Sequence, residues 1–419
     1  LTAVRSRFLM ACAGLLLCLA ASAADPRWVA AWGTAARDID GMPVGAGGAP
    51  AVLEGLSLRQ QVPLSVGGGA VRVRFSNVFG TRSPLHIAAA TVAPARGAAR
   101  VDGGSLQVLR FGGSTSVDIP AGSERWSDPV TMDVHAGQLL AVSFHLDRKT
   151  YPSTVHGPGR GATRVTTGNA VARLDWDDAP ISPWSHAVTA VDVAGAVPAG
   201  VLVAFGDSIT EGNGVPGGPQ WRYPELLGQR LRAEASRRGG RRPAKTVSVL
   251  NAGISGNRLL ADGAGQRGLD RFDRDVLAQS GVTHVLILIG INDIGYNALL
   301  DPAHAASTPA PTAAQIQTGL QQLIDRAAAR GVRVLLGTLL PFAGAPNHNE
   351  ATEATRSSVN TWIRTNRSVT GVVDFDAALR DPKHPLQLAA AYDSGDHLHP
   401  GPAGYREMAK AVPLRLLLD

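Results

Sequence analysis

The chain has 419 residues, of which 44% are hydrophobic and 18% are charged, and its formal net charge is +6. This length is typical of two or three domains, and the composition is that of an ordinary globular protein. This net charge is too mild to indicate a nucleic-acid partner. The cluster of basic residues between Arg237 and Lys245 fits a solvated loop better than a nucleic-acid-binding patch.

The first 23 residues have the pattern of a secretory signal peptide. Arg5 and Arg7 precede an apolar run over residues 8–20, which ends in the small residues Ala21-Ser22-Ala23. A basic start, a short apolar run and a small-residue site are what signal peptidase cleavage requires. We therefore expect cleavage near Ala23 and a secreted or periplasmic protein. The alternative, a buried N-terminal helix, fits this pattern less well.

Removal of residues 1–23 would also remove both cysteines, Cys12 and Cys18. The mature chain would then contain no disulfide, no thiol nucleophile and no cysteine-based metal site. No later segment approaches the roughly 20 apolar residues that a membrane-spanning helix needs, so we expect no membrane span.

Residues 24–197 show the signals of short strands and almost no helical periodicity. Over residues 71–75 valine and phenylalanine alternate with arginine, which predicts a strand with one apolar and one charged face. Further strands are predicted at residues 117–119, 130–134 and 139–146. Short strands separated by glycine and proline turns predict an antiparallel β-sandwich, or jelly roll, as an accessory domain. Residues 194–200 have the composition of a linker.

From residue 198 to residue 419 the pattern changes to strands that alternate with helices. Strands are predicted at residues 201–205, 247–250, 283–289, 332–336 and 372–375, and helices at 222–237, 312–330, 356–365 and 403–418. This alternation predicts an α/β domain, with a parallel sheet covered by helices on both sides. In such sheets, functional sites form beyond the carboxyl ends of the strands.

Polar motifs follow the first three of these strands, and a fourth motif precedes the last helix. A serine hydroxyl becomes a nucleophile only when a base removes its proton and a third group orients that base. Ser208, directly after the first strand, is the candidate nucleophile and His399 the candidate base. Asp396 lies three residues before His399, close enough to hold the imidazole through its other nitrogen.

A tetrahedral intermediate at Ser208 also needs hydrogen-bond donors for its negatively charged oxygen. We assign the oxyanion hole to the backbone N–H groups of Ser208 and Gly253 and to the side-chain amide of Asn292. Gly253 suits this role because it has no Cβ to block a close approach. Taken singly, the segment 251–253 would more often be a simple strand-ending turn, and Asn292 could merely cap a loop.

Other readings of the same loops remain open. His397 lies beside His399 and is a second candidate base, with Asp393 as its matching acid, although a surface or supporting role suits His397 better. No group of histidine, aspartate and glutamate residues has metal-ligand spacing, so no metal is expected. The sequence around Ser208 also departs from the Gly-x-Ser-x-Gly elbow of α/β-hydrolases, because Thr210 stands at the second glycine position.

The motifs at 206–210, Gly253, 290–293 and 396–399 resemble the four sequence blocks of SGNH/GDSL hydrolases, in order, over about residues 200–419. The resemblance implies a flavodoxin-like three-layer α/β/α fold, no cofactor, and Ser208, Gly253, Asn292 and His399 as the four name-giving residues. Strings at residues 28–32, 76–77, 374–376 and 392–396 further resemble the secreted two-domain arylesterase/acylhydrolase branch of bacteria.

Together these features predict a secreted serine esterase that hydrolyses carboxylic esters through an acyl-enzyme intermediate. The substrate is expected to be a small-molecule or polysaccharide ester, such as an acetyl, aryl or short-chain acyl ester. A rival hypothesis is a carbohydrate-binding or adhesion protein whose hydrolase domain has lost its activity. The complete set of Ser208, Asp396 and His399 argues against that loss.

Overall fold

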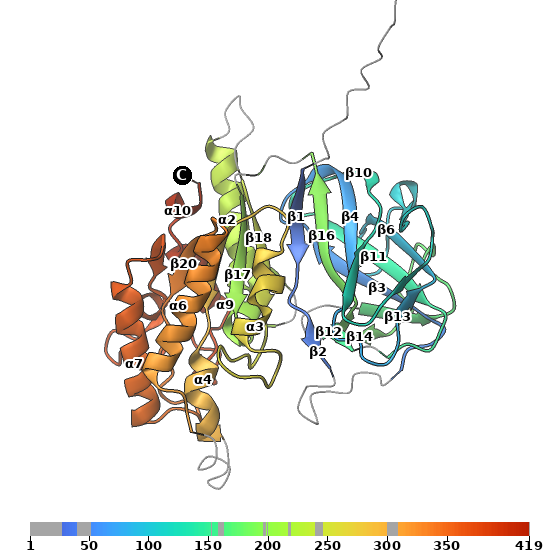
Figure 1. The fold of residues 1–419 in the computed structure, drawn as a ribbon. Coiled ribbons are helices and arrows are strands. Elements are labelled where there is room, and N and C mark those ends of the chain that lie inside the picture. The colour runs from blue at the N-terminus through green and yellow to red at the C-terminus, as the bar shows by residue number, and fades with distance from the viewer. Residues whose placement is uncertain are drawn as a thin grey trace, which may run out of the picture.

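The computed structural model of the chain describes residues 27–39, 52–151, 153–157, 163–195, 198, 200–216, 219–238, 246–299 and 309–418. The predicted signal peptide lies outside these residues. Two halves lie side by side: antiparallel strands form the N-terminal half, and strands that alternate with helices form the C-terminal half (Figure 1).

The N-terminal half is built from antiparallel sheets. The first large sheet contains β1 (Trp28–Gly33), β16 (Val188–Ala194), β4 (Gly68–Asn77), β10 (Val130–Val134) and β9 (Ser123–Trp126). The second contains β14 (Ile181–Ser182), β13 (Thr163–Thr167), β3 (Leu56–Pro63), β11 (Leu139–Leu146), β6 (Ala89–Pro94) and β7 (Gln107–Val108). Smaller sheets join β15 (Ser185–His186), β12 (Thr154–His156) and β2 (Arg37–Asp38), and β5 (Leu85–Ile87) with β8 (Val117–Ile119). The strands predicted at 117–119, 130–134 and 139–146 are confirmed.

Strand β4 shows how the sequence alternation is used. Its apolar face is buried, and Phe75 packs edge-on against Phe144 of β11 with ring centroids 5.6 Å apart, so the two large sheets share a core. The opposite face is not simply solvated. The guanidinium of Arg72 lies 4.5 Å and 4.3 Å from the ring centroids of Trp28 and Trp126. Aromatic rings therefore cover the charged face that the alternation predicted.

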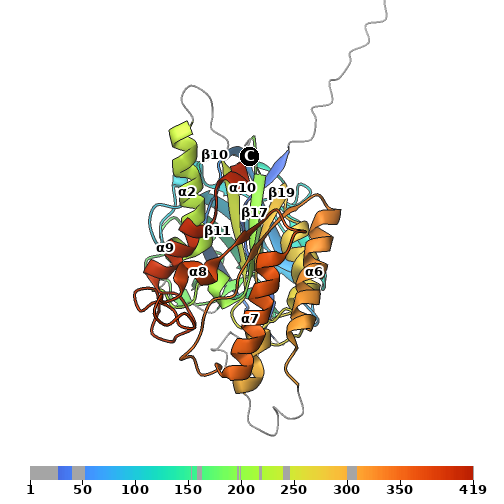
Figure 2. The same ribbon diagram turned by 90° about the vertical axis from the view of Figure 1, so that its left-hand side faces the viewer.

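The C-terminal half is centred on a parallel sheet with the strand order β18-β17-β19-β20-β21. These strands are β17 (Gly200–Gly206), β18 (Val247–Gly253), β19 (Val282–Leu288), β20 (Arg333–Gly337) and β21 (Gly371–Val373). In Figure 2, α2 (Tyr223–Arg238) and α9 (Pro402–Ala411) lie on one side of β17 and β19, and α6 (Ala313–Ala329) lies on the other. After β17 the chain forms β18 on one side of it and then β19 on the other, so the strand order reverses at β17. In open parallel sheets, sites form beyond the carboxyl ends of the strands at such a reversal.

Three predicted boundaries are wrong, each for a local reason. Helix α7 (Glu350–Thr365) begins six residues before the predicted start, because Asn349 and Thr352 form a capping box. The predicted helix 403–418 is two helices, α9 and α10 (Arg415–Leu418), because Pro413 cannot continue a helix. The strand predicted at 372–375 ends at Val373, because α8 (Phe375–Leu379) follows at once.

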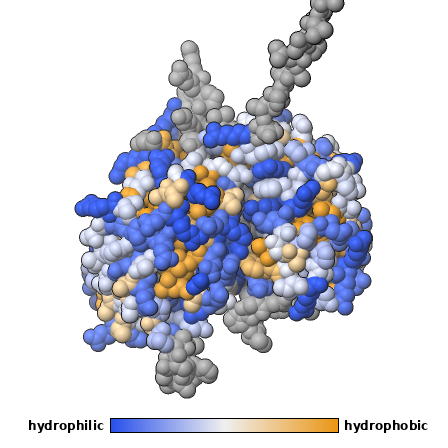
Figure 3. Space-filling model, in the orientation of Figure 1, coloured by the Kyte–Doolittle hydropathy of each residue, from blue (hydrophilic) through white to orange (hydrophobic). Residues whose placement is uncertain are grey.

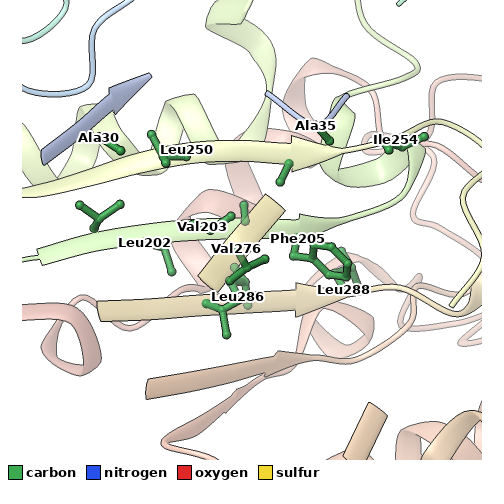
Figure 4. Close-up of a cluster of buried hydrophobic side chains, with 14 of the residues drawn as sticks. Ala30, Ala35, Leu202, Val203, Phe205, Leu250, Ile254, Val276, Leu286 and Leu288 are labelled. Atoms are coloured by element: carbon green, nitrogen blue, oxygen red, sulfur yellow. The ribbon is translucent and has the colours of Figure 1, made fainter. Parts of the chain in front are cut away.

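The two halves meet along β18, which is an edge strand of the parallel sheet. Figure 4 shows Ala30 of β1 beside Leu250 of β18, inside one continuous apolar cluster. Two serines add hydrogen bonds across this seam: Ser248 Oγ donates to the Ala30 carbonyl oxygen at 2.6 Å, and the Val249 N–H donates to Ser65 Oγ at 2.7 Å. The N-terminal half therefore covers an edge whose backbone groups would otherwise lack partners.

No helix within the described ranges is both long and apolar enough to cross a membrane. On the face that Figure 3 shows, hydrophilic side chains predominate and hydrophobic ones gather in separate patches on both halves.

Packing at the seam leads to a prediction for Ala30→Leu. Ala30 is fully buried beside β18, so three additional carbon atoms should force β1 and β18 apart. We expect a loss of about 1–3 kcal/mol in the free energy of unfolding, measured by denaturant titration, as for other overpacked cores. The control is Ala314→Leu on the exposed face of α6, which should leave stability unchanged. Wild-type stability of Ala30→Leu would show that this contact is not close-packed.

Candidate active site

Ser208 is the first residue of the short helix α1 (Ser208–Glu211), immediately after β17. Asp207 is the N-cap, and its Oδ1 accepts a hydrogen bond from the Ile209 N–H at 3.0 Å. Backbone N–H groups in the first turn of a helix have no acceptor within the helix. Among the described residues nothing accepts the Ser208 N–H, so both its hydroxyl and its N–H can serve a ligand.

His399 and Asp396 complete a hydrogen-bonded chain that begins at Ser208. His399 Nε2 lies 2.9 Å from Ser208 Oγ, and His399 Nδ1 lies 2.6 Å from Asp396 Oδ2. Partial burial raises the pKa of Asp396, but hydrogen bonds from His399 and from the Leu398 N–H outweigh this effect and lower the pKa to about 2. The ionised carboxylate therefore fixes the imidazole with its Nδ1–H toward Asp396, which leaves Nε2 able to accept the serine proton.

The second histidine of this loop has a different partner. His397 Nδ1 lies 2.7 Å from Asp393 Oδ2, and 54% of the His397 side chain is exposed. Its ring packs on the backbone of Gly344, where a Cβ atom would come within 2.9 Å of it. The structure therefore brings Ser208, His399 and Asp396 together and sets His397 and Asp393 apart as a separate pair.

Asn292 approaches the same region from α4 (Ile291–Gly295), at the carboxyl end of β19. Its Nδ2 donates to the Asn257 carbonyl oxygen at 3.0 Å. A side-chain amide has two N–H hydrogens, so this bond orients the group and leaves the second hydrogen for a ligand.

The backbone N–H of Gly253, predicted as an oxyanion donor, is already engaged. It donates to Asn251 Oδ1 at 3.0 Å, and a Cβ at Gly253 would meet the Glu211 nitrogen at 2.2 Å. Gly253 is therefore required for close packing of β18 on α1. Three residues later, Gly256 has a φ of +73°, and among the described residues nothing accepts its N–H. The Ser255-Gly256 turn signal was visible in the sequence but was not used.

Two buried carboxylates hold the loops around this site. Asp293 accepts the N–H groups of Leu259 and Leu260 at 2.6 and 2.9 Å, and burial raises its pKa to about 6. Burial also raises the pKa of Asp207 to about 7, and the nearby charge of Asp293 contributes to the rise. Asp207 Oδ2 is buried without a partner among the described residues, as expected for a carboxyl that favours its protonated form.

Arg271 connects three segments of the site: the end of β17, the end of β18 and the turn that contains Asn257. The sequence analysis did not identify this residue. Its fully buried guanidinium donates to the carbonyl oxygens of Gly206 (2.7 Å) and Ala252 (2.9 Å) and to Asn257 Oδ1 (2.9 Å). Asp275 Oδ2 lies 3.0 Å away and balances the charge. One side chain therefore sets the spacing between the ends of β17 and β18 and the turn that orients Asn292.

Within the described part of the chain, no group of three or more histidine, cysteine, aspartate or glutamate side chains is placed to hold a metal ion. What the site does offer is a proton relay from a serine hydroxyl to an imidazole, beside two unengaged N–H groups and one amide hydrogen.

Residues 204–407 match the family model described as GDSL-like Lipase/Acylhydrolase. No curated protein matches the chain. A lipolytic protein of the G-D-S-L family from Desulfitobacterium hafniense is 22% identical, with 50% of this chain and 96% of that chain covered and a TM-score of 0.36. The M. smegmatis aryl esterase is 18% identical (51% and 95% covered, TM-score 0.38), and a variant acetyl xylan esterase from Geobacillus stearothermophilus is 23% identical (52% and 95%, 0.38). Because these TM-scores are low, the structural likenesses carry no conclusion about activity.

The raised pKa of Asp207 predicts a pH-dependent effect of Asp207→Asn. The folded state keeps the Asp207 proton up to about pH 7, whereas the unfolded chain releases it near the ordinary aspartate pKa of 3.8. Wild-type stability should therefore fall as the pH rises from about 4 to 7 and then level off. Asparagine keeps the helix cap but cannot ionise. The melting temperature of Asp207→Asn, relative to wild type, should rise over this pH range.

Thermal unfolding between pH 4 and pH 9 measures this difference directly. Asp325→Asn on the exposed face of α6 controls for the loss of one carboxylate. A constant difference between Asp207→Asn and wild type across the range would contradict a protonated Asp207.

Proposed function

We propose that the chain, whose residues 204–407 match the GDSL-like Lipase/Acylhydrolase family model, is a serine esterase that cleaves carboxylic esters through an acyl-enzyme intermediate. The observation that carries this proposal is the 2.9 Å contact between His399 Nε2 and Ser208 Oγ, with Asp396 hydrogen-bonded behind the imidazole. This is the geometry that converts a serine hydroxyl into a nucleophile.

In the proposed reaction, Ser208 Oγ attacks the ester carbonyl carbon while its proton passes to His399 Nε2. The tetrahedral intermediate then collapses, the bond to the alkoxide breaks, and the imidazolium returns the proton to the leaving oxygen. A water molecule, deprotonated by the same imidazole, attacks the carbonyl carbon of the acyl-enzyme. The bond from that carbon to Ser208 Oγ then breaks, the imidazolium returns the proton to Oγ, and the carboxylic acid leaves. Asp396 stays ionised throughout and stabilises the imidazolium.

The oxyanion in this scheme is held by the Ser208 N–H and the second amide hydrogen of Asn292. For the third donor, Gly253 would first have to lose its hydrogen bond to Asn251. Gly256 needs no such change, and it directly precedes Asn257, whose carbonyl orients the Asn292 amide. We therefore place the third donor at Gly256. Donors fixed before the reaction stabilise the transition state without a cost of reorganisation.

The finer proposals rest on the sequence pattern. Residues 1–23 would direct the chain out of the cytoplasm, and residues 24–197 would form a β-sandwich accessory domain before the hydrolase domain of residues 198–419. An exported enzyme with an accessory domain suits an extracellular ester, either a small molecule or an acylated polysaccharide. A panel of aryl, short-chain acyl and acetylated-polysaccharide esters, ranked by kcat/KM, distinguishes these classes.

Ser208→Ala tests the proposed function. The hydroxyl forms the covalent intermediate, so its loss should lower kcat for p-nitrophenyl acetate by about 10⁴-fold or more. The melting temperature should stay within a few degrees, because the side chain loses a single oxygen atom. A fluorophosphonate probe should label wild type and not the variant. A variant that keeps a tenth of the wild-type kcat would overturn the assignment of the nucleophile.

The two histidines provide a matched pair for the base. His399→Ala should abolish turnover, because a general base contributes about 10²–10⁴-fold. His397→Ala should keep at least about a tenth of kcat, because His397 is bonded to Asp393 and not to Ser208. Steady-state kinetics of both variants on one ester decides the matter. The opposite order of effects would make His397 the base and Asp393 the orienting acid.

A further inference from the structure

Glu211 links the nucleophile helix to the turn that carries the proposed oxyanion donors. It is the last residue of α1, and only 2% of its side chain is exposed. Its Oε2 accepts hydrogen bonds from the Ser255 N–H and from Ser255 Oγ, the latter at 2.5 Å. Ser255 directly precedes Gly256. The position of the Glu211 carboxylate therefore fixes the near end of this turn relative to Ser208.

The other oxygen of this carboxylate faces the N-terminal half of the chain. Glu211 Oε1 lies 3.5 Å from Nε2 of His156, the last residue of β12. His156 Nδ1 lies 2.8 Å from the Ala35 carbonyl oxygen, which can only accept, so Nδ1 carries a hydrogen. Nε2 then attracts Oε1 only when a proton lies between them. The pKa of His156 is lowered overall, because burial outweighs the opposing effects of the Glu211 charge and of the hydrogen bond to Ala35.

Arg37 fixes the far end of the same turn. This residue of β2 is 3% exposed, and its guanidinium donates to the Gly157 carbonyl oxygen at 2.7 Å, next to His156. Its Nε donates at 2.8 Å to the carbonyl oxygen of Ala264 in the C-terminal half. The Ala264 methyl group packs against Gly256, where a Cβ would meet it at 2.8 Å. Strands β2 and β12 pair with each other at the seam between the halves (Figure 1).

We propose that His156 and Arg37 are positioning residues through which the N-terminal half completes the hydrolase site. His156 holds Glu211, and through it Ser255, while Arg37 holds Ala264 against Gly256. The turn between them is thereby kept in the conformation that presents the Gly256 N–H. This inference rests on the proposed esterase function, and it makes the N-terminal half part of the catalytic unit.

The arrangement matters for rate because oxyanion donors act only when they are already in place. A displacement of about 1 Å can cost up to about 10²-fold in rate even when the chemistry itself is untouched. Binding of the ground-state ester depends much less on the same donors, so a loosened turn lowers kcat more than it changes KM. A contact that only joined the two halves would affect stability and leave both constants alone.

Two substitutions at His156 separate these roles. In His156→Asn the amide can replace Nδ1 and keep the bond to Ala35, but it cannot reach Glu211. In His156→Gln the amide can replace Nε2 and donate to Glu211 Oε1. We expect kcat to fall about 10- to 100-fold in His156→Asn with KM within about threefold of wild type, and to recover to within about threefold of wild type in His156→Gln. Fluorophosphonate labelling rates of Ser208 should follow kcat.

Arg37→Lys provides an independent test of the proposal if His156→Asn folds poorly. It keeps the charge but cannot donate to two carbonyl groups in a fixed fork, so kcat should fall while KM holds. His86→Asn is the control, because His86 is a largely buried histidine of the same half whose partners are Asp118 and Asp147. Wild-type kcat in both His156→Asn and Arg37→Lys would overturn the inference, as would losses that simply follow melting temperature. Failure of the proposed function would show differently, as a wild-type protein with neither ester turnover nor probe labelling.

Discussion

The site depends on the buried guanidinium of Arg271. Its donors reach the carbonyl oxygens of Gly206 and Ala252, at the ends of β17 and β18, and the side chain of Asn257 in the turn after β18. The Gly206 oxygen also accepts the N–H of Ile254, so it receives two hydrogen bonds. A guanidinium is suited to this place because its five N–H donors have a fixed planar arrangement, whereas an ammonium group has three donors on one atom. Burial lowers the pKa of Arg271 to about 10, so Asp275 is needed to keep the charge acceptable. Removal of one partner of such a pair costs about 3–5 kcal/mol.

The hydrogen bonds of Arg271 explain how the proposed oxyanion donors could keep a fixed spacing although they lie in three different segments. Ser208 follows Gly206 by two residues, and Asn292 is oriented by the carbonyl of Asn257. Both reference points are bonded to the same side chain, so their spacing does not depend on the flexibility of either loop. Two buried acidic side chains add further bonds: Asp207 accepts the N–H of Ile209 after β17, and Asp293 accepts the N–H of Leu259 after β18. A site built in this way needs little change when a substrate arrives.

The sequence predicted the parts of this arrangement that follow local rules. The apolar strands of the parallel sheet, the Ser208 turn and the three-residue spacing of Asp396 and His399 were visible, because each depends on neighbours in the chain. Arg271 was not visible, since its acceptors are backbone atoms 19 and 65 residues away and a short Asp-Arg-Phe stretch looks like an exposed helix. Gly253 was predicted as a donor because a strand end is easy to locate in the sequence, whereas the Asn251 side chain that accepts its N–H is not. His156 and Arg37 could not be singled out from the sequence, because only the folded chain brings His156 to Glu211 and Arg37 to Ala264.

The contacts between the two halves explain how His156 and Arg37, which belong to the N-terminal half, are held beside the site. An apolar contact alone, such as Ala30 on Leu250, tolerates sliding, because its energy depends on buried area and not on direction. The seam also contains directional bonds along β18 and just before β19. Ser248 donates to the Ala30 carbonyl, the Val249 N–H donates to Ser65, and Ser280 donates to the buried Asp192, which also accepts from Arg72. A shift by even half a residue would break all of them at once and leave buried polar groups unpaired. The N-terminal half therefore covers the edge strand β18 in one fixed position. That fixed position also holds β2 and β12 close to Glu211.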